Sequence, residues 1–364
     1  RRPLPHGLGE RRAFGSQALA PMERQSKPKR PVLRRTLIGC AATTAVLAAL
    51  LVFLALTLSP GATDFDSPHH PYRSDEAKQE FLASYDARAS KWPVPSTTTT
   101  VPTTYGPTFV RMSGPEAGAP LVLLHGAGGS SLHWLPNIAA LSKHYRTYAV
   151  DIVGDLGRSV HTRDLGSADD YAAWLDELLD ALDLEHDINL VGLSYGGWIS
   201  ARYALHAPER LRKVVLLAPA GTVAPLPFSW IWRAILVALP HPFFTKRFLY
   251  WVLEDLSRTQ EGRVLLDEAA DAGYRAMRAR TPRQMAPPDV FSDQALQSFA
   301  IPVLFVVGEN EKLYPAADAV ARLSEVAPTI ETQIVHSAGH DLTMVQADRV
   351  NRIIVDFLAE PSAP

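Results

Sequence analysis

Cysteine is almost absent from this chain, and its scarcity limits both the covalent structure and the metal chemistry that are available. Cys40 is the single cysteine among 364 residues, so no disulfide can form within the chain. Zinc sites built from several cysteines are excluded for the same reason. We therefore expect the fold to depend on its apolar core alone.

Most of the chain also lacks an excess of basic residues. Residues 1–35 carry ten Lys or Arg and two Glu, whereas residues 36–364 carry 26 basic and 36 acidic residues. The long body is therefore acidic and has no basic footprint for nucleic acid, which we exclude as a partner. Residues 1–35 are predicted to form a basic, disordered cytoplasmic tail.

Charge is missing altogether from residues 36–58. As a helix this segment would be about 35 Å long, enough to cross a hydrocarbon core of about 30 Å. The basic tail before it favours a single membrane span with the N-terminus cytoplasmic and the rest of the chain extracytoplasmic. A buried helix and a cleavable signal peptide are the alternatives. Residues 59–71, rich in Pro, Gly, Asp and His, are predicted to be a linker.

After residue 72 the chain alternates predicted strands and helices, which is typical of an α/β fold with a mostly parallel sheet. Strands are expected at 97–101, 108–112, 121–124, 147–151, 188–193, 213–217, 301–307 and 331–336, and helices at 74–89, 132–144, 168–182, 196–206 and 342–358. Residues 221–298 interrupt this rhythm, and their first half is unusually apolar. We therefore predict a core made of residues 72–220 and 299–360, with a helical cap inserted between the two parts.

One serine stands between a predicted strand and a predicted helix, in the sequence VGLSYGG. Ser194 has a glycine two residues away on either side, Gly192 and Gly196. This is the pattern of a nucleophile elbow, in which a sharp turn projects the hydroxyl above the sheet and the glycines let strand and helix approach. A glycine-rich turn without a catalytic role is the alternative, and the surrounding sequence favours the nucleophile.

A glycine-rich loop follows another apolar strand, in the sequence LVLLHGAGGSS. Such a loop can direct backbone N–H groups towards the serine, where they would stabilise the anion formed during acyl transfer. We assign this oxyanion hole to the N–H groups of Ala127 and Tyr195. His125 and Gly126 are interpreted as support for the loop, and His125 is expected to bond to nearby backbone.

A carboxylate and an imidazole follow the last two predicted strands. Glu311 comes after IPVLFVVG and is the predicted catalytic acid, with Glu309 as its competitor. His340 lies in the loop after the final strand and is the predicted general base, whereas His336 is a rival on the strand itself. Both predicted residues lie where an open α/β sheet places its site residues. The order serine, acid, histidine is the one used by α/β-hydrolases.

Two further carboxylates end a strand at the same edge, Asp151 and Asp155. Either could reach the site, but hydrogen bonding within the loop is the favoured interpretation.

Taken together, the chain resembles the α/β-hydrolase superfamily and, more narrowly, the small bacterial carboxylesterases of the naproxen-esterase type. The likeness extends over residues 72–358 and rests on the sequences LLHGA, YRTYAVDIVGD, GLS, GENE and AGH. The resemblance implies a triad of Ser194, His340 and Glu311, with glutamate where most α/β-hydrolases carry aspartate.

We therefore expect a membrane-anchored serine hydrolase that cleaves carboxylic esters through an acyl-enzyme, without a metal or an organic cofactor. The apolar cap suggests hydrophobic esters as substrates. Other chemistries on the same triad remain open: cofactor-free haloperoxidase-like reactions, hydrolysis of carbon–carbon bonds, and acyl transfer. A membrane-tethered binding protein that keeps the fold without catalysis is the alternative from another class.

Overall fold

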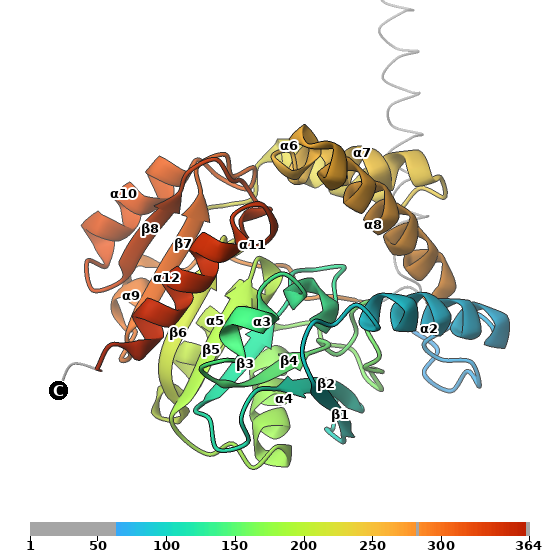
Figure 1. Cartoon of the computed structure of the whole chain (residues 1–364), viewed down its shortest axis with the longest axis horizontal. Coiled ribbons are helices and arrows are strands. Elements are labelled where there is room, and N and C mark those ends of the chain that lie inside the picture. The colour runs from blue at the N-terminus through green and yellow to red at the C-terminus, as the bar shows by residue number, and fades with distance from the viewer. Residues whose placement is uncertain (1–62, 282–283, 362–364) are drawn as a thin grey trace, which may run out of the picture. The chain divides into compact units, whose positions relative to one another are not determined.

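The computed structural model describes residues 63–281 and 284–361 of the chain (Figure 1). The predicted tail at 1–35 and the predicted membrane span at 36–58 lie outside these residues. Within the described ranges, no helix is both long enough and apolar enough to cross a membrane. The described part of the predicted linker consists of turns and irregular chain.

Eight strands form one sheet in the order β1-β2-β4-β3-β5-β6-β7-β8. Their bounds are β1 Ser96–Val101, β2 Thr108–Ser113, β3 Pro120–Leu124, β4 Arg146–Val150, β5 Ile188–Leu193, β6 Leu211–Leu217, β7 Val303–Gly308 and β8 Glu331–Val335. Strands β1 and β2 pair in antiparallel fashion, as do β2 and β4, and every later pair is parallel. The predicted mostly parallel sheet is confirmed.

Helices cover both faces of the sheet because its central strands are apolar on both sides. In β3, Val122 and Leu124 belong to one core cluster, and Leu121 and Leu123 to the other. This division follows from the two-residue period of a strand. The first cluster includes side chains of α4 (Ala168–Ala181), α5 (Tyr195–His206) and α10 (Ala316–Val326), and the second those of α3 (Ile138–Leu141) and α12 (Ala347–Ala359).

Two predicted helices are interrupted. The helix expected at 132–144 is a short 3₁₀ helix, η1 (Ser131–Trp134), followed by α3. Pro136 lies between them, and proline disfavours a continuous helix because it lacks an N–H and crowds the preceding turn. The helix expected at 342–358 is divided into α11 (Leu342–Val345) and α12 at Gln346, whose φ of −124° and ψ of 35° are not helical.

The inserted interval contains α6 (Phe228–Val237), α7 (Pro242–Val252), η3 (Leu256–Arg258), α8 (Gln260–Ala279) and α9 (Asp293–Gln297). Figure 1 shows α6, α7 and α8 gathered apart from the sheet. In contrast, α9 belongs with the core: its Leu296 joins the first core cluster, and Gln297 bonds to the end of α10. We therefore use "cap" for α6 to α8.

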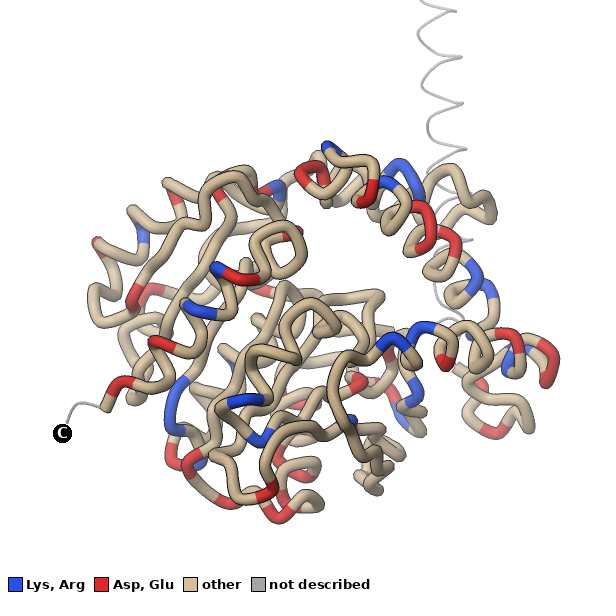
Figure 2. The backbone as a smooth tube through the Cα atoms, in the orientation of Figure 1, with Lys and Arg blue, Asp and Glu red and all other residues tan. Residues whose placement is uncertain are grey.

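The far end of the cap packs on α2 (Asp75–Ala89), which precedes the sheet (Figure 1). Phe81 and Tyr85 of α2 and Ala276 of α8 belong to one apolar cluster. Both helices carry acidic and basic positions along their length (Figure 2), and Lys91, just after α2, forms an exposed ion pair with Glu268 of α8. The chain before the sheet thus supports the cap.

Candidate active site

Ser194 lies at the turn between β5 and α5, in a strained backbone conformation. Its φ of 54° and ψ of −114° are unusual for a residue other than glycine. A Cβ added at Gly192 would lie 2.2 Å from the carbonyl oxygen of Gly196, and one added at Gly196 would lie 2.4 Å from that of Leu124. Only glycine fits at these two positions, so the strand and the helix can meet closely enough to form the turn.

The loop after β3 approaches this serine. A Cβ built on Gly126 would lie 3.2 Å from the Cβ of Ser194 and 3.7 Å from its hydroxyl oxygen. Ala127 follows in the chain, and Tyr195 is the first residue of α5, whose N-terminal N–H groups have no acceptor within the helix. The two backbone segments predicted to hold the oxyanion therefore flank the Ser194 side chain.

His125 and Asp155 fix this loop by hydrogen bonds to the backbone. The buried His125 ring accepts from the N–H of Ile152 at 3.0 Å through Nε2, so Nδ1 carries the proton and donates to the carbonyl of Gly126 at 2.8 Å. The Asp155 carboxylate accepts the N–H of Gly128 at 3.0 and 3.1 Å. These contacts hold the loop next to Ser194.

The loop carrying Asp155 is in turn attached to the end of the cap. Arg280, the residue after α8, is buried and donates to the carbonyl oxygens of Asp155 and Gly157, the latter at 2.5 Å. Asp151, the other carboxylate that ends a strand at this edge, accepts the N–H groups of Ser131 and Arg158 at 2.6 Å each. Asp151 and Asp155 therefore both bond to backbone.

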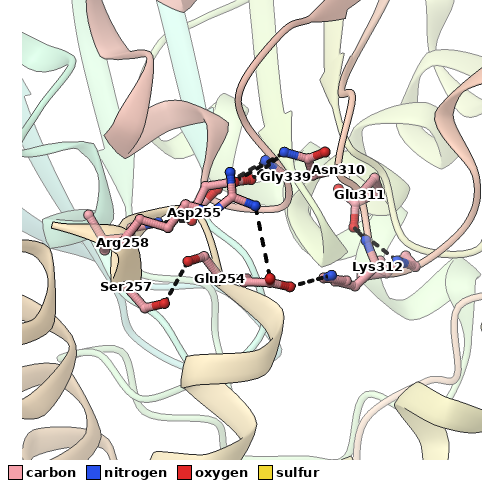
Figure 3. Close-up of polar contacts among 11 residues, drawn as sticks. Glu254, Asp255, Ser257, Arg258, Asn310, Glu311, Lys312 and Gly339 are labelled. Carbon is pink, nitrogen blue, oxygen red and sulfur yellow. Dashed lines mark hydrogen bonds and ion pairs between the residues drawn. The ribbon is translucent and has the colours of Figure 1, made fainter.

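Glu311 and His340 form a hydrogen-bonded pair. Nδ1 of His340 lies 3.0 Å from Oε2 and 3.1 Å from Oε1 of Glu311, whose side chain is fully buried. Oε1 also accepts the N–H groups of Lys312 at 2.7 Å and Leu313 at 2.9 Å (Figure 3). The backbone thus fixes the carboxylate in front of the imidazole.

The electrostatics of the pair favour a charged imidazole. Burial of His340 opposes protonation, but the charge of Glu311 and the hydrogen bond to it outweigh burial and raise the pKa of His340. The neighbouring charge of Asp341 acts in the same direction. His340 is therefore a stronger base than an ordinary histidine.

The alternative acid and the alternative base considered in the sequence, Glu309 and His336, do not belong to this pair. Nδ1 of His336 lies 3.3 Å from Oε1 of Glu309 at the surface, and Glu309 also accepts the N–H of Ser337. Neither is bonded to His340. Glu311 is thus the carboxylate that the fold joins to this histidine.

Ser194, Glu311 and His340 follow β5, β7 and β8, so all three lie at the carboxyl edge of the parallel strands. In the described ranges no hydrogen bond joins the Ser194 hydroxyl to the His340 ring. Such contacts are often long without substrate and shorten when substrate binds. The described residues also contain no cluster of His, Cys, Asp and Glu suited to a metal ion.

Two buried carboxylates near this site, Asp255 and Asp341, received no role from the sequence. Asp341 directly follows His340, and this adjacency was the one signal available for it. Asp255 lies in the cap interval and carries no motif.

Comparison with known proteins agrees with this geometry. Residues 121–353 match the model of the alpha/beta hydrolase family. The chain is 36% identical over 277 residues to the uncharacterized carboxylesterase nap of Bacillus subtilis, covering 76% of this chain and 91% of that protein. It is 35% identical over 287 residues to carboxylesterase YbfK of the same organism, covering 78% and 95%.

Solved structures show the same relationship. The crystal structure of naproxen esterase (carboxylesterase NP) from Bacillus subtilis superposes with a TM-score of 0.72 at 35% identity, over 79% of this chain and 99% of that one. With a strained serine at the elbow and an ester-cleaving relative of this similarity, the chain belongs to the alpha/beta hydrolase family, as a serine hydrolase of the carboxylesterase kind.

Proposed function

We propose that the protein hydrolyses hydrophobic carboxylic esters through an acyl-enzyme on Ser194, with His340 as general base and Glu311 as its partner. The observation that carries this proposal is the hydrogen bond between His340 and the buried Glu311 carboxylate. In the neutral imidazole the proton lies on Nδ1, which donates to the carboxylate, so Nε2 is unprotonated and can accept a proton.

In the first step Ser194 Oγ attacks the ester carbonyl and its proton passes to Nε2 of His340. The carbonyl oxygen becomes an anion, which the N–H groups of Ala127 and Tyr195 stabilise. The bond to the alcohol then breaks, and the alcohol leaves with the proton from His340. Glu311 stabilises the imidazolium between these two transfers.

In the second step a water molecule attacks the acyl-enzyme. His340 takes a proton from this water and returns it to Ser194 Oγ as the carboxylic acid is released. Each proton taken by His340 is given back, so the cycle closes without any further reactant.

The preference for hydrophobic esters is inferred from the cap. Helix α6 buries none of its side chains, and four large apolar residues on it are exposed: Phe228, Ile231, Trp232 and Ile235. Exposed apolar surface of this kind typically binds an apolar ligand or partner. We assign it to the acyl or alcohol group of the substrate.

The membrane anchor is proposed from sequence alone. Residues 36–58 carry no charge and follow a strongly basic segment. We propose that this segment holds the catalytic domain at the extracytoplasmic face of a membrane.

Substitution of Ser194 tests the mechanism directly. We expect Ser194→Ala to lower kcat on a p-nitrophenyl ester by about 1,000-fold or more, because no nucleophile remains. The far-ultraviolet circular dichroism spectrum should be unchanged. A fluorophosphonate probe should label the native protein on the Ser194 peptide and leave the variant unlabelled. Undiminished turnover by the variant would contradict the proposal.

A further inference from the structure

The immediate neighbours of the two proposed catalytic side chains are held by one segment of the cap. Residues 254–258 join α7 to α8 and include η3. Glu311 has Asn310 before it, and His340 has Asp341 after it. Figure 3 shows Asn310, Glu311 and Gly339 brought together with the cap residues Glu254, Asp255 and Arg258. The contacts come from side chains that the proposed mechanism does not use.

Asp255 is bonded to one catalytic loop and lies next to the other. It is buried, and its two carboxylate oxygens each accept from Nδ2 of Asn310 at 3.1 Å. Arg258 donates to the same carboxylate at 2.7 Å. A Cβ built on Gly339, the residue before His340, would lie 3.3 Å from Oδ2 of Asp255. One side chain is therefore hydrogen-bonded to the loop of the acid and adjacent to the loop of the base.

Asp341, the residue after His340, forms a second attachment between the cap and the loop of His340. Its Oδ2 accepts the N–H of Leu256 at 2.7 Å, and its Oδ1 accepts the N–H of Gly339 at 3.1 Å. Asp341 is almost entirely buried. Its carboxylate thus joins the cap backbone to the residue on the other side of His340.

Lys312, the residue after Glu311, is also bound to the cap. Lys312 forms an ion pair with Glu254 at 2.5 Å, and both side chains are partly exposed. Its backbone N–H is one of the two that bond to the Glu311 carboxylate. The side chain of Lys312 therefore contacts the cap while its backbone contacts the catalytic acid.

Buried carboxylates cost free energy unless hydrogen bonds satisfy them, and here two are buried at the same junction. We propose that Asp255 and Asp341 are positioning residues, which fasten the Glu311 and His340 loops to the cap and thereby set the geometry of the hydrogen bond between the two side chains. This inference rests on the proposed function. It implies that the position of the cap and the basicity of His340 are linked.

The variant Asp255→Asn tests this role with little change in shape. The amide offers one acceptor oxygen in place of two and brings N–H groups towards Asn310 and Arg258, so the loops should separate. We expect kcat on a short ester to fall about tenfold, with little change in KM. We also expect the pKa of His340, measured by NMR titration of the imidazole, to fall, because its contact with Glu311 loosens. Asp341 is left unchanged because its own charge acts on His340.

Asp176→Asn is the matched control. The Asp176 carboxylate on α4 also joins an arginine and a neutral donor, Arg210 and Tyr203, at 2.7 Å each. Its loss should lower the melting temperature and leave the pKa of His340 unchanged. The double variant Asp255→Asn with Asn310→Asp exchanges donor and acceptor, and it should recover part of both kcat and the pKa.

The outcomes distinguish the positioning role of Asp255 from the proposed esterase function. If Asp255→Asn leaves the pKa of His340 at its native value, or if it behaves like Asp176→Asn, the positioning role is wrong. This readout does not depend on turnover. If instead the pKa falls as expected but the native protein neither cleaves esters nor is labelled at Ser194, the positioning role stands and the proposed function fails.

Discussion

At the scale of single residues, Glu311 has the clearest consequence for pH dependence. Its carboxylate accepts hydrogen bonds from two backbone N–H groups and from the imidazole of His340. The charge of this carboxylate raises the pKa of His340. A base with a raised pKa stays protonated to a higher pH. In a plot of kcat/KM against pH, the acid limb should therefore have an apparent pKa above about 6.5, the ordinary value for histidine.

Glu311→Gln should lower kcat by about 100-fold to 10,000-fold, since the neutral amide no longer stabilises the imidazolium. The acid limb should also move to lower pH, because the charge that raises the pKa of His340 is gone. Rates measured between pH 4 and pH 9 check both effects. Glu309→Gln is the control, and a larger loss in that variant would show that the acid is misassigned.

The sequence was sufficient to predict the pairing of Glu311 with His340, because each lies in the loop after a predicted strand, at the same sheet edge. It was not sufficient to predict Asp255. The partner of Asp255, Asn310, is 55 positions away, and only the folded cap brings them together. Buried polar contacts of this kind depend on tertiary packing and leave no local pattern.

At the scale of elements, the central strands were predictable because strands buried on both faces form short, continuous apolar runs. The helix at 132–144 was predicted as continuous although Pro136 lies within it, and the proline was a readable signal. The break at Gln346 was not readable, because glutamine is an ordinary helix former. The cap helices were predicted as an insertion without individual bounds.

Helix α6 allows a test of substrate preference at this scale. Ile231 and Ile235 lie one turn apart, so their exposed side chains share a face. Replacing both by Ser should raise KM for a twelve-carbon ester about tenfold, since about 1.4 kcal/mol of apolar contact corresponds to that factor. KM for a two-carbon ester should not change.

Val264→Ser on α8 is the control for this experiment, because Val264 is an exposed apolar residue of another cap helix. Equal effects of the α6 and α8 substitutions would count against a substrate-binding role for α6. A preference of the native protein for the shortest esters would also count against a substrate-binding role for α6.

At the scale of the whole molecule, the alternation of strands and helices predicted the architecture, and the family relationship agrees with it. The anchor at 36–58 stays a prediction. The full chain should sediment with membranes and resist a carbonate wash, whereas deletion of residues 36–58 should release activity into the soluble fraction. Full-length protein found in the soluble fraction would contradict the anchor.

The two attachments of the cap constrain how a substrate can enter. One end of the cap is bound to the loops of Glu311 and His340, and the other end is bound through Arg280 to the loop that supports the oxyanion segment. A rigid swing of the whole cap would break both attachments and disturb Glu311, His340 and the oxyanion loop together. Bending of α6 alone would break neither of these attachments, although it would separate Trp230 from Phe248 of α7, so we expect movement of α6 to admit an ester.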